Sequence, residues 1–361
     1  MTTTRPERLT ELDGLLTWRE ASTAGPAIAA AVAEAAKGPG AVATRLLAAA
    51  EHVLVTGAGS SYYLAATTAA AARATVHRPF LAAPLSEVLL RPGGVFVSRT
   101  STAEPVVVIS RSGSTSEAVA VVEAARAAGH PTIGVTCRAD SPVAQLADVT
   151  LVSPAGNEQA VVMTRSFGSM LALLLRVIAA LAGDDHLAAD LDRAADRWPE
   201  ALAAAARGRE LGRRDWSRVV VLGGGPRSGI AAEWGLKLLE TSQVPTMAYE
   251  PLEFRHGPIS VCEPGVLVVG LVGGDGAADE VRVLEESRRL GATTWVLAGE
   301  ASEAAGTDGD VDLVGTGLRP EARLPLLLTP GHALALSLAL TRGRDPDAPR
   351  HLDQVVILEP G

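Results

Sequence analysis

The chain has 361 residues, with 41 acidic and 32 basic side chains and a formal net charge of −9. Hydrophobic residues make up 47% and charged residues 20%, which excludes a disordered chain and predicts about two globular domains. The acidic surface disfavours nucleic acid and anionic membranes as partners, and two cysteines, Cys137 and Cys262, provide no disulfide framework. Because neither a signal peptide nor a spanning helix is recognisable, we expect a cytoplasmic protein.

Short β-branched runs alternate with Ala-rich helical stretches, which predicts parallel sheets covered by helices on both faces. Strands of a first sheet are expected at 52–56, 105–109, 132–136 and 149–152. After a charged helical connector at 183–216 the pattern restarts, with strands expected at 218–222, 245–249, 266–271, 294–298 and 311–314. The predicted fold class is therefore α/β, with two doubly wound halves related by an internal repeat.

In each half the first strand runs into a glycine-rich turn, TGAGSS at 56–61 and LGGGPRSG at 222–229. The first turn offers backbone N–H groups and serine hydroxyls to an anion. Tyr62 stands where the dinucleotide fingerprint needs its last glycine, which disfavours a nicotinamide cofactor and a dehydrogenase. An ordinary structural turn explains the same composition equally well.

A second turn of the first half carries five hydroxyl side chains within residues 110–116, called the serine loop below. These hydroxyls and the following helix N-terminus can surround a phosphate, and Arg111 can add a charge-assisted contact. The alternative is a capping box formed by Ser114 and Glu117. Both turns follow strands of one sheet, where ligands bind in open α/β folds, and this favours the phosphate site. The equivalent loop of the second half, 272–276, has no serine, so no phosphate site is expected there.

Glu233, Lys237 and Glu240 lie at i, i+4 and i+7 of a predicted helix and therefore share one face. They form either a solvent-facing stripe of ion pairs or a carboxylate base beside an ammonium group that stabilises developing negative charge. His256 stands before a Gly-Pro turn and is either a further acid–base group or a surface histidine. No histidine cluster with metal-ligand spacing occurs, so no metal site is expected.

Six segments together resemble the SIS (sugar isomerase) family: GAGSSYY, ISRSGSTSEA, GNEQAVVMTRSF, EWGLKLLE, EFRHGP and DAPRHLDQVVIL. The similarity is to the isomerase half of glutamine–fructose-6-phosphate aminotransferases and to stand-alone amino-sugar-phosphate deaminases, deglycases and ketose/aldose phosphate isomerases. It implies two tandem flavodoxin-like domains, a phosphate-binding one at 26–195 and one with acid–base residues at 205–345. An N-terminal arm at 1–25 and a C-terminal tail at 346–361 complete the expected organisation.

The resemblance also implies roles for single residues. Glu240 would move a proton between C1 and C2 of the sugar, with Lys237 and Glu233 beside it. His256 would open the sugar ring from the partner subunit of a homodimer with a shared active site. The residues implied in phosphate binding are Ser61, Ser110, Arg111, Ser112 and Thr115. Those implied in lining the sugar site are Gly59, Ser60, Val161 and Gln354. No metal or organic cofactor is implied.

Two departures from the family pattern limit the expected chemistry. Gln354 stands where the aminotransferases have a lysine that forms a Schiff base, and Met163 replaces a small polar residue near the substrate's amino group. The sequence also shows no glutaminase domain, so we expect no amino transfer from glutamine. The remaining expectation is a sugar-6-phosphate isomerase or amino-sugar-phosphate deaminase. A fructosamine-6-phosphate deglycase, a simple aldose/ketose isomerase and a non-catalytic sugar-phosphate-binding regulator are the alternatives.

Overall fold

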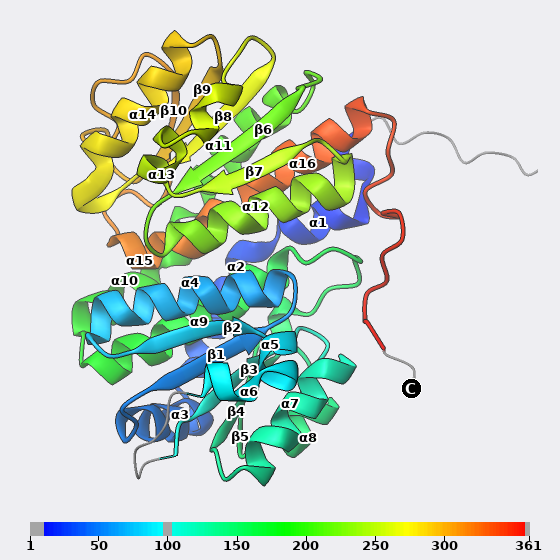
Figure 1. Cartoon of the computed structure of the whole chain (residues 1–361), viewed down its shortest axis with the longest axis vertical. Helices are drawn as coiled ribbons and strands as arrows, with labels where there is room; N and C mark the ends of the chain where they lie inside the picture. The colour runs from blue at the N-terminus through cyan, green and yellow to red at the C-terminus, as the bar shows by residue number, and fades with distance from the viewer. Residues whose placement is uncertain (1–10, 97–102, 358–361) are drawn as a thin grey trace, which may run out of the picture.

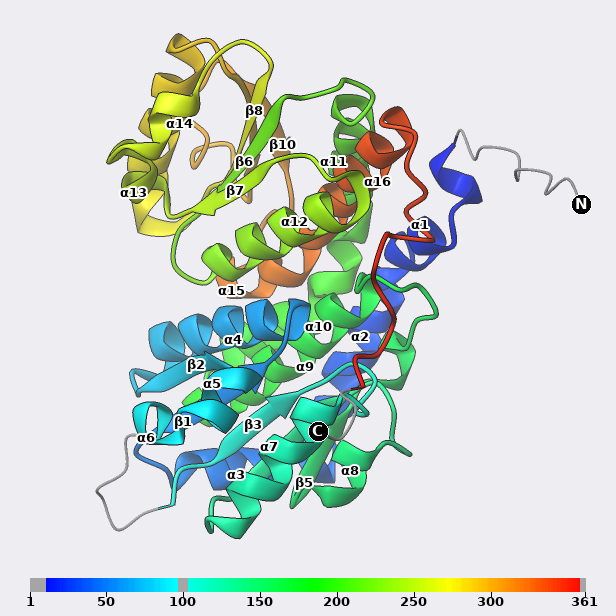
Figure 2. The same cartoon turned by 45° about the vertical axis from the view of Figure 1, so that its right-hand side comes forward.

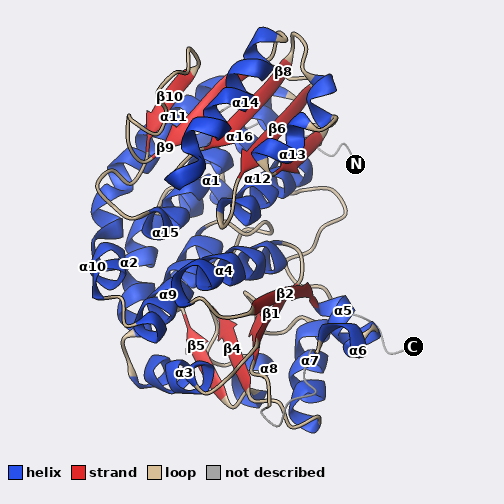
Figure 3. Cartoon of the chain, turned by 60° about the vertical axis from the view of Figure 1, so that its left-hand side comes forward, coloured by secondary structure: helices blue, strands red, loops and turns tan. Residues whose placement is uncertain are grey.

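A computed structural model describes residues 11–96 and 103–357. This part of the chain forms two α/β units, the first below the second in Figure 1, and each contains one five-stranded sheet. Figure 3 shows both sheets in red, each between layers of helices. The end of the chain leaves the upper unit and runs down one side of the molecule to the lower unit (Figures 1 and 2).

The central strands of the two sheets are mostly apolar and buried, as parallel strands covered on both faces must be. The first sheet contains β1 (Val53–Gly57), β2 (Phe80–Pro84), β3 (Val106–Ile109), β4 (Thr132–Thr136) and β5 (Val149–Val152). The second contains β6 (Arg218–Gly223), β7 (Thr246–Tyr249), β8 (Val266–Leu271), β9 (Thr293–Ala298) and β10 (Asp310–Leu313). Their orders are β2-β1-β3-β4-β5 and β10-β9-β8-β6-β7, and all pairs are parallel. Numbered within each unit, both are the flavodoxin-like order 2-1-3-4-5, which confirms the predicted fold class and internal repeat.

The sequence predicts every strand except β2. Its sequence, FLAAP, has no β-branched residue and ends in proline, so it lacks the usual signal of a strand. It lies at the edge of the first sheet and pairs only with β1, where a missing backbone N–H is tolerated. The strand exists because β1 offers it a hydrogen-bonding edge, and a local sequence window does not contain that information.

Helices connect the strands and cover both sheets. In the first half they are α1 (Leu16–Ala21), α2 (Ala24–Ala35), α3 (Gly38–Ala48), α4 (Ser60–Val76), α5 (Leu85–Leu90), α6 (Pro92–Val95), α7 (Ser116–Ala127), α8 (Pro142–Leu146) and α9 (Arg165–Ala182). They continue as α10 (Asp185–Arg193), α11 (Trp198–Leu211), α12 (Arg227–Ser242), α13 (Pro251–Arg255), α14 (Ala277–Arg289), α15 (Pro320–Arg323) and α16 (Leu328–Thr341). The expected connector at 183–216 contains α10 and α11, and α11 packs along α16.

Two helical stretches, 165–182 and 320–341, are long and apolar enough to cross a membrane by length and composition alone. However, 72% and 89% of these stretches, respectively, lie buried inside the protein. Leu171, Phe167, Leu334 and Leu338 from the two stretches belong to the same large core cluster. Both stretches therefore serve as core helices of this fold.

The two units meet through α4 of the first and α12 of the second, which lie side by side in Figures 1 and 2. Gly229 at the start of α12 makes this contact possible. A Cβ at that position would lie 2.2 Å from Thr67 Oγ1 and 2.6 Å from the carbonyl oxygen of Tyr63. The close approach fixes how the end of α12 faces the beginning of α4.

We expect Gly229→Ala to destabilise the protein, because the added methyl group meets backbone of α4 that cannot rotate away. The cost should be about 1–3 kcal/mol, as for other overpacked sites, despite the better helix propensity of alanine. Urea unfolding of the variant and the parent protein measures it. Gly38→Ala is the matched control, because a Cβ there would have no neighbour within 4 Å. Equal unfolding free energies for Gly229→Ala and the parent would show that the helices can separate freely.

Candidate active site

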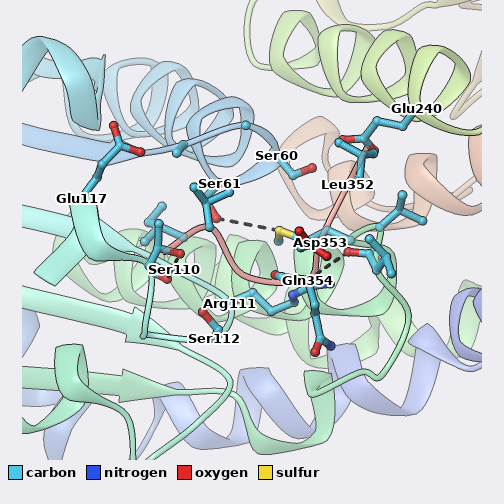
Figure 4. Close-up of a pocket in the computed structure, with 18 of the residues that line it drawn as sticks. Ser60, Ser61, Ser110, Arg111, Ser112, Glu117, Glu240, Leu352, Asp353 and Gln354 are labelled. Atoms are coloured by element: carbon cyan, nitrogen blue, oxygen red, sulfur yellow. Dashed lines mark hydrogen bonds between the residues drawn. The ribbon is translucent and has the colours of Figure 1, made fainter. Parts of the chain in front are cut away.

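A pocket of about 220 Å³ lies between the two units and the C-terminal tail. Figure 4 shows residues of both units and of the tail directed into it. All the site residues predicted from the sequence line it, apart from Glu233 and His256. They are Gly59, Ser60, Ser61, Ser110, Arg111, Ser112, Thr115, Val161, Lys237, Glu240 and Gln354. Residues that are far apart in the sequence therefore form one site.

The serine loop connects β3 to α7 and forms the floor of this pocket. Gly113 has a φ of +63°, and a Cβ there would lie 2.1 Å from Ser141 Oγ, so the turn requires glycine. The N-cap of α7 is Thr115, whose side chain makes no capping hydrogen bond, so the capping box considered above is not formed. In the described residues, the backbone N–H groups of Ser112 and Thr115 also have no partner. The loop thus presents unused hydrogen-bond donors to the pocket.

The turn after β1 adds a second group of donors at the start of α4. Gly59 is the N-cap residue with a φ of +55°, a conformation that favours glycine. Ser60 and Ser61 form the first turn of the helix, are both buried and line the pocket. Ser61 Oγ lies 3.8 Å from Met163 Sδ on the opposite wall. Two helix N-termini therefore open into one cavity, a suitable arrangement for an anion.

Arg111 does not extend freely into the pocket. Its Nη1 donates to Glu158 Oε1 at 3.3 Å and to the carbonyl of Ala160 at 3.1 Å. Its Nη2 donates to the carbonyls of Val161 at 3.0 Å and Gln354 at 2.9 Å. The guanidinium group thereby joins the serine loop, the wall at 158–161 and the C-terminal tail. In this geometry Arg111 acts as a positioning residue for the pocket.

Two glutamates that sequence analysis did not select hold the wall at 158–161. Glu158 is buried and accepts hydrogen bonds from the backbone N–H and hydroxyl of Thr164, in addition to its ion pair with Arg111. Glu20 of α1 accepts from the backbone N–H groups of Gln159 and Ala160 at 2.8 and 2.9 Å. Glu158 lies within GNEQAVVMTRSF, one of the segments that carry the family resemblance. That segment was the sequence feature from which its importance could have been predicted. No local sequence pattern indicates the role of Glu20, because its partners Gln159 and Ala160 are far away in the sequence.

The C-terminal tail, described up to residue 357, is fixed at several points along its path. Asp347 accepts hydrogen bonds from the backbone N–H groups of Leu16 and Thr17 at the start of α1. Gln354 Nε2 donates to the carbonyl of Glu158 at 3.0 Å, and the carbonyl of Val356 accepts from the serine loop. The side chain of Gln354 is thus hydrogen-bonded to the wall, in the position where the aminotransferases of the family have a lysine.

The acid–base residues lie on α12, and their burial excludes the solvent-facing stripe. Glu233 is fully buried, and Lys237 is 2% exposed. Lys237 Nζ forms an ion pair with Glu240, which lines the pocket, and lies 3.6 Å from Glu233 Oε1. A carboxylate at the pocket surface is therefore backed by an ammonium group and, behind it, by a second carboxyl group.

The burial changes the protonation of this group of three. Burial raises the pKa of Glu233 to about 8, against the lowering effect of Lys237. For Lys237, burial lowers the pKa, but Glu233 and Glu240 raise it by more, so the net shift is upward. Near neutral pH the ammonium is retained, and Glu233 holds a proton. Lys237 then balances the charge of Glu240.

His256 lies outside the pocket of its own chain. It ends α13, is exposed, and precedes Gly257, whose φ of +123° makes the tight turn expected from the sequence. In Figures 1 and 2, α13 lies on the left of the upper unit and the C-terminal tail on the right. No group of three or more His, Cys, Asp or Glu side chains suited to a metal occurs within residues 11–96 and 103–357.

A family model for the SIS domain matches residues 46–180 and 214–316, one segment in each α/β unit. The chain belongs to the SIS domain family. The resemblance stated from the sequence is therefore confirmed. The matched segments fall within the two predicted domains, whose boundaries stay predictions.

Curated relatives of this SIS protein include glutamine–fructose-6-phosphate aminotransferases. That of Aeropyrum pernix is 32% identical over 268 residues, which cover 70% of this chain and 43% of the relative. That of Photorhabdus laumondii is 26% identical over 330 residues, which cover 88% of this chain and 53% of the relative. The SIS protein thus spans about half the length of these relatives.

Solved structures of the same fold cover nearly the whole chain. Glucosamine-6-phosphate deaminase from Thermotoga maritima is 26% identical with a TM-score of 0.77, over 95% of this chain and 100% of that one. Tagatose-6-phosphate ketose/aldose isomerase from Escherichia coli is 24% identical with a TM-score of 0.80, over 96% and 97% of the two chains. The SIS protein therefore has the same fold as both of these proteins.

The second unit of the SIS protein fills its equivalent turns with its own carboxylates. Glu280 accepts from the backbone N–H of Gly273 at 3.1 Å and pairs with Arg227 at 2.7 Å. Glu303 accepts from the backbone N–H groups of Gly274 at 3.2 Å and Gly299 at 2.8 Å. In the loop after β8, which corresponds to the serine loop, the backbone N–H groups of Gly273 and Gly274 are thus already bound to carboxylates.

The pKa of Glu233 predicts a specific dependence of stability on pH. Between its ordinary value of 4.5 and about 8, the folded state keeps a proton that the unfolded state has lost. The contribution of protonated Glu233 to the free energy of unfolding is therefore complete below pH 4.5 and is lost as the pH rises to about 8. We expect Glu233→Gln to flatten the fall of the unfolding free energy across this range, measured by urea unfolding at several pH values. The exposed Glu123→Gln of α7 should keep the parent slope, and an unchanged slope in Glu233→Gln would contradict the assignment.

Proposed function

We propose that this SIS protein is an enzyme that moves a proton between C1 and C2 of a sugar 6-phosphate, acting as an isomerase or an amino-sugar-phosphate deaminase. One observation carries the proposal. A single pocket joins the hydroxyl-rich helix N-termini of the first unit to the buried Lys237–Glu240 pair of the second. The reactions named for its relatives, phosphosugar isomerisation and glucosamine-6-phosphate deamination, need both ends of such a pocket.

The serine loop and the start of α4 bind the phosphate in this proposal. Ser61, Ser110, Ser112 and Thr115 supply hydroxyl groups, and two helix N-termini supply backbone N–H groups and a positive potential. Arg111 contributes its charge from the side and holds the wall in place. A phosphate fixed there directs the other end of an open-chain sugar toward α12.

Glu240 is the proposed base. Its carboxylate takes the proton from C2 of the open-chain aldose while the aldehyde oxygen is protonated, which gives an enediol, or an enolamine where C2 carries nitrogen. Return of the proton to C1, with loss of the proton from the hydroxyl at C2, completes the aldose-to-ketose conversion. The ammonium of Lys237, which is paired with Glu240, stabilises the negative charge that develops beside it.

With an amine at C2, the same proton transfer leads to deamination. Protonation of the enolamine at C1 gives a ketose imine, which water hydrolyses to the ketose phosphate and ammonia. No electrons are exchanged, and water supplies the new oxygen atom. This route needs no Schiff base with the protein. Gln354 has no amine that could form one, and its side chain donates a hydrogen bond to the carbonyl of Glu158.

Ring opening is assigned to His256 of a second copy of the chain. Within one chain His256 is exposed and does not line the pocket, so the proposed role requires a partner subunit. The proposed unit is therefore a homodimer with shared active sites. A cytoplasmic location, as expected from the sequence, belongs to the same proposal.

The assay that tests the function uses the purified protein with glucosamine 6-phosphate and with a panel of hexose 6-phosphates. We expect ammonia and fructose 6-phosphate from the amino sugar, or exchange of the C2 proton with solvent deuterium observed by NMR. Glu240→Gln should lower the rate by about 100-fold or more with little change in ligand binding, because only the proton transfer is lost. Glu123→Gln serves as the surface control. Binding without ammonia release or proton exchange would identify a sugar-phosphate-binding regulator instead.

Mixing two inactive variants tests the shared site. Glu240→Gln and His256→Asn are each expected to be inactive as homodimers. If His256 acts across the dimer, random reassociation restores about a quarter of the parent activity, because each mixed dimer has one intact site. If His256 acted within its own chain, the mixed sample would stay as inactive as its two components.

A further inference from the structure

The C-terminal tail places a carboxylate in the pocket for which the proposed proton transfer has no use. Asp353 lines the cavity together with its neighbours Leu352 and Gln354. Within the residues that the structure describes, its side chain forms no hydrogen bond and no ion pair. A carboxylate at a binding site without any protein partner is available to a ligand.

The two cations of the pocket are already engaged by other groups. Lys237 is paired with Glu240 and lies beside Glu233. Arg111 is paired with Glu158 and donates to three backbone carbonyls. The charge of each cation is therefore already balanced by a carboxylate of the protein, and neither gives the pocket a net positive charge.

The charge balance of the pocket lining is therefore negative. Two positive side chains, Arg111 and Lys237, face three negative ones, Glu117, Glu240 and Asp353. A phosphate brings further negative charge into this cavity. A ligand that also carries an ammonium group relieves the repulsion, whereas an uncharged sugar ring does not.

The position of Asp353 matches the sugar end of such a ligand and not its phosphate. Figure 4 places it next to Leu352 and Gln354, on the side of the pocket away from Ser110 and Glu117. Its backbone is held in place because the carbonyl of the next residue, Gln354, accepts a hydrogen bond from Arg111. The backbone at Asp353 is thus fixed beside the pocket, while its exposed side chain has no partner in the protein.

We propose that Asp353 is a specificity-determining residue that binds the protonated amine of an amino-sugar phosphate. The proposal rests on the function proposed above and narrows its substrate class to sugar phosphates that carry a positive charge. The amine donates a charge-assisted hydrogen bond to the carboxylate, which orients C2 relative to Glu240. No covalent step involves Asp353.

Calorimetric titration with glucosamine 6-phosphate and with glucose 6-phosphate tests the proposal, because the two ligands differ only in the amine or hydroxyl at C2. His256→Asn serves as the background, because loss of the proposed ring opening prevents conversion of either ligand while every charged side chain that lines the pocket is kept. We expect the amino sugar to bind at least about tenfold more tightly. Adding Asp353→Asn should reduce this ratio to within about threefold while glucose 6-phosphate still binds, which shows that the pocket is intact.

Adding Glu117→Gln to the same background is the matched control, because it removes one negative charge from the same pocket on the opposite side. A direct contact predicts that only Asp353→Asn changes the ratio. If the affinity ratio fell equally in both variants, the total charge of the pocket would set the preference, and the role of Asp353 would be overturned. Equal binding of both ligands to the background protein would overturn it too while leaving the proposed function in place. If neither ligand nor any other hexose 6-phosphate bound, the proposed function itself would fail.

Discussion

The site depends on the close contact between α4 and α12. Each helix follows the first strand of its sheet, and each unit alone carries only half of the required chemistry. At Gly229 the missing side chain lets the two backbones approach, so that the start of α4 faces the part of α12 that carries Lys237 and Glu240. The hydroxyl-rich helix N-termini and the Lys237–Glu240 pair then share one cavity. In the proposed function, this packing sets the distance that a substrate must span.

The buried pair of Arg111 and Glu158 has a similar role for the rest of the pocket wall. Burying an ion pair costs desolvation energy, and this cost is tolerable only when the remaining donors and acceptors are satisfied. Here the guanidinium also bonds to three carbonyls, and Glu158 accepts from Thr164. The pair therefore couples three separate chain segments, and Gln354 is held by it instead of swinging freely.

Much of the fold and of the site was predictable from the sequence, because the relevant signals are local. Short apolar runs predicted nine of the ten strands to within a residue at each end. Residue type and spacing indicated the serine loop and the acid–base residues of α12. The structure adds what depends on distant partners. β2 forms through its neighbour in the sheet, and Arg111 bonds to a carbonyl 243 residues away. Asp353 lies within the segment DAPRHLDQVVIL, but its residue type and spacing did not mark it, and only the path of the tail brings it to the pocket.

The two units share one topology but differ at the carboxyl ends of their strands, and this difference explains why one chain has one site. In the second unit Glu280 and Glu303 occupy the backbone donors that the first unit leaves to a ligand. A second phosphate there would have to displace carboxylates that are already hydrogen-bonded and ion-paired. The second unit is thus free to contribute α12 to the cavity of the first. It also carries His256 on an exposed turn, outside the pocket of its own chain.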